Sequence, residues 1–380
     1  LTTRHVLHHV TFHFVDRWPI SLPATFTCTE RMRRFERISH VVESVEEYRV
    51  GGYHPVHLGD MFHQRYRVVG KWGYGEFSTV WIAEDLRLQR NVTLKILRAD
   101  ASKDSRELSV LLRLSESSIH HSGENHVLQL LDHFEHRGPN GLHLCLVFPV
   151  MMSDGNAINA RGKPRCPGYI RKVLKQILLG LNYIHTLGLI HCDLQPGNTL
   201  FTVDSDLSNE SMMEQEFIPV KWLPGVEADD SAPRYLMDSR RPYGMLDDAP
   251  ISDLIVKIGD MGGGLSHPLI DTVVHIIDEY WSQSDYCSRI FELATNEPLF
   301  PILTWGSTAE ELRQLLQSLE SKLFENGFQN FATFLGERLP TEFGTENISQ
   351  LADILWSMLQ ELPRNRKTAT ELLSHSFLAE

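Results

Sequence analysis

The chain has 380 residues, 42% of them hydrophobic and 22% charged, so it can bury a large core as one big domain or as two lobes. Its net charge of −13 argues against a nucleic-acid-binding protein, which would present a basic face. Apolar runs are too short to span a bilayer, and the five cysteines show neither CxxC nor CxxH spacing. The composition therefore argues against a membrane span, a disulfide framework and a cysteine-based zinc site, and it favours a reducing intracellular compartment.

Short strands dominate the first part of the chain. The hydrophobic pattern predicts, in chain order, strands over 66–70, 78–83 and 92–97, a helix over 105–114, and strands over 127–134 and 142–148. A Gly-Pro-Asn-Gly turn at 138–141 separates the last two strands. These elements predict a small, mostly antiparallel sheet with one helix.

Helices dominate after Pro149. Apolar residues from Ile170 to Ile184 follow the spacing of one buried helical stripe, and a capping box at 307–310 opens a leucine-rich helix. Two more helices are predicted around 348–358 and over 368–374. We therefore expect an α+β fold with a β lobe over 50–149 and a helical lobe over 150–380, preceded by a partly disordered extension, 1–49. A cleft between two such lobes is where ligands usually sit.

An acidic segment interrupts the second lobe at about 202–253. It contains twelve Asp and Glu against four Lys and Arg, a local charge of −8, together with several Pro and Gly and little periodicity. Such composition indicates a long insert. Two interpretations remain open for it: a solvated loop, or a docking surface for basic substrates or partners.

The nine residues 190–198, IHCDLQPGN, are the most informative segment. They place Asp193 and Asn198 five positions apart on one loop that follows an amphipathic helix. A phosphotransferase uses this spacing to hold a hydroxyl nucleophile with one side chain and a magnesium ion with the other. The segment therefore predicts a phosphoryl-transfer loop.

A glycine-containing turn and a lysine precede this loop. Glycines in such a turn let backbone N–H groups approach phosphates closely. Lys95 lies on the third predicted strand, where it can neutralise the α- and β-phosphates, and Glu107 on the next helix can pair with Lys95 and orient it. The residues of the turn that we assign to nucleotide binding are Gly73, Tyr74, Gly75, Ser78 and Val80.

In this order the motifs resemble those of the eukaryotic protein kinases, and more narrowly those of the SR-protein kinase family in its fungal branch. The resemblance covers roughly residues 50–377. It is carried by YHPV at 53–56, the glycine turn with STVW at 73–81, the paired strands between 126 and 148, residues 191–198, VKIGDMG at 256–262, FELAT at 291–295 and PRNRKTA at 363–369.

The resemblance implies a bilobal protein-kinase-like fold that uses ATP and Mg²⁺. Asp193 matches the base that accepts or orients the substrate hydroxyl, while Asn198 and Asp260 match the two magnesium-holding residues. The resemblance further places Phe148 at the back of the adenine pocket, and Pro149 and Met151 in the hinge beside it. Pro149 has no N–H but keeps its carbonyl, so the adenine amine still has an acceptor.

Several residues depart from the family pattern. Cys192 stands where Arg is commoner, and Gln195 stands where a protein kinase normally has the cation near the transferred phosphoryl group. The span from Gly262 to Phe291 is shortened and lacks an Ala-Pro-Glu-like motif, so the peptide-recognising segment is deleted or rebuilt. Neither Asp278 nor Asp285 cleanly matches the bracing Asp of that region. Arg366, which normally pairs with the Glu of the missing motif, is expected to lack that partner.

Three functions are consistent with these features. The first is a Ser/Thr protein kinase, with ATP and a protein substrate, Arg/Ser-rich proteins being the candidates. The second is a nucleotide-binding pseudokinase or scaffold, favoured by Gln195 and the shortened segment. The third is a small-molecule phosphotransferase, since His-x-Asp-x-x-Pro-Gly-Asn also resembles aminoglycoside and choline kinases. We expect a monomer of the cytoplasm or nucleus that contacts neither nucleic acid directly nor a membrane.

Overall fold

The computed structural model of the protein describes residues 33–40, 42–103, 105–159, 164–203, 216–239, 246, 249–263, 265–266, 290–292, 294–295, 327–360 and 365–379. The described residues fall into two compact units, one that contains residues 33–37 and 221–228 and one that contains the described residues of 38–220 and 229–380. In the first unit, the Glu36 N–H donates to the Lys221 carbonyl over 2.8 Å, and the rings of Phe35 and Trp222 lie 4.4 Å apart. The second unit carries all the residues that the sequence assigns to chemistry.

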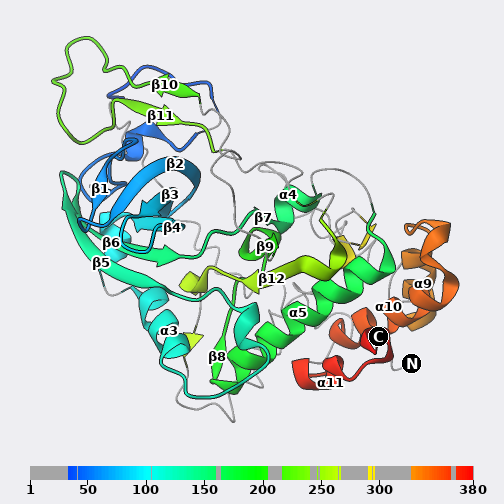
Figure 1. Ribbon diagram of the computed structural model, residues 1–380. Helices are drawn as coiled ribbons and strands as arrows, with labels where there is room; N and C mark the ends of the chain where they lie inside the picture. The colour runs from blue at the N-terminus through cyan, green and yellow to red at the C-terminus, as the bar shows by residue number, and fades with distance from the viewer. Residues whose placement is uncertain are drawn as a thin grey trace, which may run out of the picture. The chain divides into compact units, whose positions relative to one another are not determined.

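The second unit begins with strands and ends with helices, as its sequence predicts (Figure 1). Its strands are β1 (Met61–Phe62), β2 (Tyr66–Gly75), β3 (Ser78–Asp85), β4 (Arg90–Leu97), β5 (Asp132–Gly138), β6 (Gly141–Phe148), β7 (Ser153–Asp154), β8 (Leu189–Ile190), β9 (Thr199–Val203), β10 (Phe217–Pro219), β11 (Tyr235–Met237), β12 (Leu254–Ile258) and β13 (Leu265–Ser266). Its α-helices are α2 (Ala99–Ser102), α3 (Arg106–Ser115), α4 (Gly155–Asn159), α5 (Pro167–Thr186), α9 (Phe328–Gly336), α10 (Thr345–Met358) and α11 (Ala369–Leu373).

Six antiparallel strands form the main sheet in the order β1-β2-β3-β4-β6-β5. Apolar residues on one face form a core that includes Phe62, Trp81 and Leu94, each no more than 2% exposed. Burial of such side chains contributes about 1.5–3 kcal/mol each. The opposite face packs, through Leu144 and Leu146, into a second core shared with the helices. The sheet therefore holds β3 and β4 rigidly at the position of the predicted phosphate residues.

One strand begins later than the sequence pattern predicts. We expected a strand over 127–134, but β5 begins only at Asp132. Val127 instead makes an isolated parallel bridge with Ile258, and the Leu128 N–H donates to the Ile258 carbonyl over 2.8 Å. Residues 127–128 therefore pair with the end of β12, a distant partner that an apolar run alone does not reveal.

Helix α5 packs against β8 and β12, the strands next to the loop of residues 191–198 and the segment of Asp260. Pro167 stands at its first turn, where the missing N–H costs nothing, and its buried stripe runs from Ile170 to Ile184 as predicted. Gln176 is a buried polar exception on this helix. Its amide donates to the Leu254 carbonyl over 2.9 Å and accepts from the Val256 N–H over 2.7 Å. The helix thereby satisfies the open edge of β12, which pairs with β9 on its other side.

The predicted C-terminal helices are confirmed where the structure describes them. α10 and α11 match the expected positions, and Thr368 with Glu371 forms a capping box at the start of α11. The helix expected after Ser307 lies outside the described residues. None of the helices in the described ranges is long and apolar enough to cross a bilayer.

The described part of the acidic insert is ordered. β10 and β11 pair with each other, and Met237, 1% exposed, joins the core of the main sheet. The Tyr235 hydroxyl accepts from the Leu58 N–H over 3.0 Å, and the Asn140 amide donates to the Ser231 carbonyl over 2.7 Å. The solvated-loop interpretation is therefore wrong for residues 231–237. Local composition could not predict these contacts, because their partners in the sheet lie far away in the sequence.

Three histidines lie close together at the main sheet: His54 and His143 are buried, and His136 on β5 is half-buried. The His54 ring centroid lies 4.6 Å from that of His136 and 4.9 Å from that of His143. The Nδ1 atom of His54 and the Nε2 atom of His143 are buried without a hydrogen-bond partner. Burial, reinforced by the two neighbouring imidazoles, lowers the pKa of His54 from 6.5 to about 3. The folded state therefore holds His54 neutral across the physiological range.

We predict that acid destabilises this protein through His54. Below pH 6.5 the unfolded chain binds a proton at this residue and the folded chain does not, so stability falls as the pH decreases. At pH 5 the loss from this residue is about 2 kcal/mol. Urea unfolding between pH 7.5 and pH 5 should show a shallower loss in His54→Gln than in the wild type. The exposed His133 provides the control, and equal slopes for His54→Gln and His133→Gln would contradict the prediction.

Candidate active site

The side chains of Lys95, Glu107 and Asp260 meet at one point. Lys95 on β4 donates from Nζ to Glu107 Oε1 over 2.6 Å and to Asp260 Oδ1 over 2.8 Å. Glu107 comes from α3, whose first turn is capped by the Ser105 hydroxyl, and Asp260 follows β12. The predicted pairing of Lys95 with Glu107 is confirmed, and the structure adds Asp260 as a second partner.

Burial and the neighbouring charges together determine the protonation of Lys95, Glu107 and Asp260. Burial alone would lower the pKa of Lys95, but the adjacent carboxylates outweigh it, and the pKa is raised. Burial would raise the pKa of Asp260, but the Lys95 ammonium outweighs it, and the pKa is lowered. Burial raises the pKa of Glu107, with Lys95 opposing. The cluster therefore presents an ammonium for phosphate and an ionised Asp260 carboxylate for a hard cation.

His191 anchors the loop that follows β8. This residue is 1% exposed, its Nε2 lies 2.8 Å from the Gly259 carbonyl, and its Nδ1 accepts from the Asp193 N–H over 3.3 Å. The Gly259 N–H donates in turn to the Asn198 carbonyl over 2.8 Å. Burial lowers the pKa of His191, which keeps the ring neutral with one donor and one acceptor nitrogen. The loop is thereby fixed to the segment that carries Asp260.

The Asp193 carboxylate is held by two amides of the same loop. Asn198 Nδ2 donates to Asp193 Oδ2 over 3.1 Å and to its carbonyl over 2.8 Å. Gln195 Nε2 lies 3.0 and 3.3 Å from the two carboxylate oxygens. Cys192 adopts a left-handed backbone with φ of 62°, which is uncommon for a side chain of this kind. Gln195 therefore orients Asp193 although it brings no positive charge.

The glycine turn is tighter than the sequence suggests. β2 continues to Gly75 and pairs Gly75 with Ser78 and Gly73 with Val80, so only Glu76 and Phe77 form the turn itself. Tyr74 and Gly75 are exposed, whereas Ser78 is buried. In the next pair of strands, Val80 is the partner of Lys95. The turn and the lysine are thus adjacent on one sheet, in the arrangement expected for binding phosphates.

The residues expected around adenine lie at the end of the sheet. Phe148 pairs with Thr93 at the end of β6, and Phe148 and Met151 are each 5% exposed, with Pro149 between them in the chain. The Thr93 Oγ1 atom is buried and has no hydrogen-bond partner. A buried hydroxyl without a partner costs free energy, so it fits a site completed by a polar ligand. The residues present are therefore compatible with a nucleotide, although the separate adenine roles remain predictions.

The side chains of Asn198 and Asp260 are compatible with binding of Mg²⁺. Within the described residues, no group of three or more His, Cys, Asp or Glu side chains could hold a metal ion alone. Mg²⁺ that arrives with a nucleotide needs only one or two protein ligands besides phosphate oxygens and water. Asn198 and Asp260 supply an amide oxygen and a carboxylate of the type it prefers.

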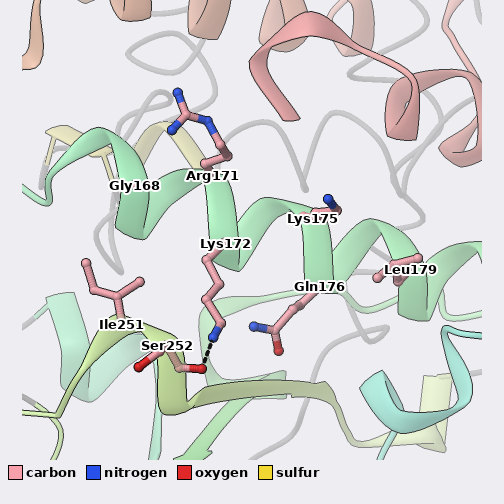
Figure 2. A pocket seen from close by; sticks show the side chains of 8 residues that line it. All are labelled: Gly168, Arg171, Lys172, Lys175, Gln176, Leu179, Ile251 and Ser252. Carbon is pink, nitrogen blue, oxygen red and sulfur yellow. Dashed lines mark hydrogen bonds between the residues drawn. The ribbon is translucent and has the colours of Figure 1, made fainter. Parts of the chain in front are cut away.

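A surface groove of about 400 Å³ lies elsewhere, along α5 (Figure 2). Its lining includes Arg171, Lys172 and Lys175 but none of the predicted site residues. Lys172 donates to the Ser252 carbonyl, as Figure 2 shows, and Arg171 donates to the Phe377 carbonyl over 2.6 Å. At least two of these cations therefore serve to hold neighbouring segments of the chain.

The predicted peptide-binding defect concerns residues that the structure mostly does not describe. Most of the span from Gly262 to Phe291 lies outside the described residues, including Asp278 and Asp285. Arg366 is described, and its Nε donates to the Gln360 carbonyl over 2.9 Å. The guanidinium expected to lack its acidic partner thus has a backbone partner in the same region of the chain.

Two residues near the glycine turn were given no role by the sequence. Tyr53 contacts the turn through its hydroxyl, and Arg98, the residue after β4, reaches the same turn. The segment YHPV contributes to the family resemblance and was therefore a signal for Tyr53. Arg98 carried no signal, because an isolated Arg after a strand is usually a solvated charge.

Comparisons with known proteins agree with this geometry. A family model described as the protein kinase domain matches residues 66–208. The chain is 41% identical over 182 residues to protein kinase dsk1 of Schizosaccharomyces pombe, covering 45% of this chain and 33% of that protein. It is 41% identical over 175 residues to the serine/threonine-protein kinase SKY1 of Saccharomyces cerevisiae, covering 42% of this chain and 23% of that protein. The match thus spans a third or less of the length of these two relatives.

A third relative matches over most of its length, and a solved structure shows the fold. The serine/threonine-protein kinase SRPK of Physarum polycephalum is 28% identical over 409 residues, covering 89% of this chain and 91% of that protein. A crystal structure of a kinase domain superposes with a TM-score of 0.53 at 18% identity, covering 86% of this chain and 98% of that one. The predicted bilobal α+β fold is confirmed. The chain is similar to the protein kinases, with residues 66–208 matching the kinase-domain model, and among them it is similar to the SR-protein kinases.

Proposed function

We propose that this chain is an ATP-dependent Ser/Thr protein kinase that transfers the γ-phosphoryl group to protein hydroxyls. One observation carries the proposal: Lys95 bridges Glu107 and Asp260 while Asn198 and Gln195 hold the Asp193 carboxylate. Phosphoryl transfer requires mainly positioning and charge neutralisation, and this set of side chains supplies both.

Each residue has a defined task in this proposal. Asp193 orients the substrate hydroxyl and accepts its proton as the oxygen bonds to the γ-phosphorus and the bond to the β-phosphate oxygen breaks. Lys95 binds the α- and β-phosphates, and Glu107 keeps its ammonium in place. Asn198 and Asp260 would hold Mg²⁺, which supplies positive charge to the phosphate oxygens when bound.

We assign adenine binding to the residues at the end of the main sheet. Phe148 and Met151 offer apolar surface, the Pro149 carbonyl offers an acceptor for the adenine amine, and Thr93 offers its buried hydroxyl. On the glycine turn, we assign the phosphates to the backbone around Gly73, Gly75 and Ser78, with Tyr74 and Val80 beside them. This arrangement buries the base and leaves the γ-phosphate toward Asp193.

The proposed substrates are proteins rich in Arg and Ser. Several relatives are named as SRPK or SRSF protein kinases, and the acidic insert gives this chain a local charge of −8 between residues 202 and 253. Acidic surface raises the local concentration of basic partners and speeds their association. The resemblance also supports a monomer that works in the cytoplasm or nucleus.

A second candidate function is a nucleotide-binding scaffold without phosphate transfer. The observation that favours it is the neutral amide of Gln195 beside Asp193, where a kinase normally has Lys. Without that cation, charge developing on the transferred phosphoryl group is stabilised less. In this proposal nucleotide binding does not depend on residue 195, so the two candidate functions differ only in phosphate transfer.

We predict that Asp193 is required for phosphate transfer but not for nucleotide binding. With Mg²⁺ and ATP, the wild type should phosphorylate an Arg/Ser-rich peptide, and Asp193→Ala should lower the rate by at least about 100-fold. The affinity for ADP should change little, because Asp193 contacts no base or α-phosphate in this proposal. A peptide with Ser replaced by Ala is the negative control. Equal rates for wild type and Asp193→Ala would refute the proposal, whereas binding without transfer would favour the scaffold.

We further predict that Gln195→Lys increases the rate of phosphate transfer. A lysine here can keep the contact to Asp193 and add positive charge next to the transferred group, which should raise kcat by about 10- to 100-fold. Gln195→Met, which has neither charge nor amide, serves as the matched control and should lower kcat. Steady-state kinetics with saturating peptide measure both effects. A lysine variant no faster than the wild type would show that this position does not act electrostatically.

A further inference from the structure

We propose that Tyr53 is a positioning residue that holds the glycine turn between β2 and β3 in the conformation that receives the ATP phosphates. The proposal rests on the proposed function, since it assigns this turn to nucleotide binding. Tyr53 belongs to the YHPV segment, which precedes the main sheet and takes no part in the chemistry described above.

The Tyr53 hydroxyl contacts the tip of the turn directly. It donates to the Gly75 carbonyl over 2.8 Å and lies 3.2 Å from the Glu76 carbonyl, and the residue is 5% exposed. A trans peptide is planar, so its N–H points opposite to its C=O. By holding these two carbonyls, Tyr53 directs the N–H groups of Glu76 and Phe77 to the other side of the turn. Backbone N–H groups with a common direction are what a phosphate-binding turn requires.

Tyr53 is itself held from several sides. Its N–H donates to the Glu47 carbonyl over 3.0 Å, and its own carbonyl accepts from the buried Asn140 amide over 2.6 Å. The Arg98 guanidinium lies 5.3 Å from the centroid of the Tyr53 ring and forms ion pairs with Glu47 at 3.1 Å and Asp100 at 3.0 Å. The hydroxyl therefore has one position, fixed by the sheet and by the segment before it.

The turn has few other tertiary anchors in the described structure. Phe77 is 60% exposed, and a Cβ placed on Gly75 would meet no atom within 4 Å. Apart from Tyr53, the contacts to the turn are the Arg98 N–H to the Phe77 carbonyl at 2.9 Å and Arg98 Nη1 to the Glu76 carbonyl at 3.5 Å. An exposed glycine-containing turn samples many conformations, and ordering it before the ligand arrives removes part of the entropic cost of binding.

The decisive variant is Tyr53→Phe, which keeps the ring and its contact with Arg98 and removes only the hydroxyl. The control is Tyr66→Phe, because the Tyr66 hydroxyl donates to Asp132 over 2.6 Å in the same sheet but makes no contact with the turn. We expect the Kd for Mg²⁺-ATP, and the KM for ATP, to rise about 3- to 10-fold in Tyr53→Phe, with kcat and the control within about twofold of wild type.

A second measurement reports on the turn without any ligand. Hydrogen exchange of the amides at 75–78 in the nucleotide-free protein should be faster in Tyr53→Phe and unchanged in Tyr66→Phe. Unchanged affinity together with unchanged exchange in Tyr53→Phe would overturn the assignment, as would a loss confined to kcat. A wild type that binds Mg²⁺-ATP without transferring phosphate would sink the proposed kinase activity and leave the Tyr53 assignment standing. A wild type that binds no nucleotide would overturn both.

Discussion

The Lys95 ammonium lies between the carboxylates of Glu107 and Asp260, and this pair of contacts determines how the site is built. Burial would lower the pKa of Lys95 if Glu107 and Asp260 were not beside it. Satisfying that charge requires β4, α3 and the segment after β12 to converge. The main sheet and the helical core therefore meet at this ion cluster, and the chemistry that it supports follows from the same three side chains.

Two further sets of hydrogen bonds fix the segments next to this ion cluster, namely the Asp193 loop and the turn between β2 and β3. His191 ties the Asp193 loop to Gly259, immediately before Asp260, so the proposed base and the proposed metal ligand share one support. Tyr53 and Arg98 hold the turn between β2 and β3. In each case a buried side chain, His191 or Tyr53, bonds to backbone groups, which fixes the position of a loop without using any group that contacts the substrate. Positioning of this kind contributes strongly to catalysis.

Patterns that depend on near neighbours in the sequence predicted most of the fold. The stripe of α5, the strands β3, β4 and β6 and the pairing of Lys95 with Glu107 were all foreseeable from periodicity and motif order. Contacts between distant segments were not. Residues 127–128 pair with the end of β12, and residues 231–237 pack on the main sheet. Each of these depends on a partner that composition cannot identify.

We propose that the cluster of Lys95, Glu107 and Asp260 binds ATP together with Mg²⁺. Calorimetric titration of the wild type and Asp260→Asn with ATP, each in the presence and absence of Mg²⁺, tests it most directly. Asp260 is ionised next to Lys95, so we expect Mg²⁺ to tighten ATP binding in the wild type and to have little effect in the variant. If the affinity for ATP is unaffected by Mg²⁺ in the wild type, or changes equally with Mg²⁺ in both proteins, then Asp260 does not bind Mg²⁺ together with ATP.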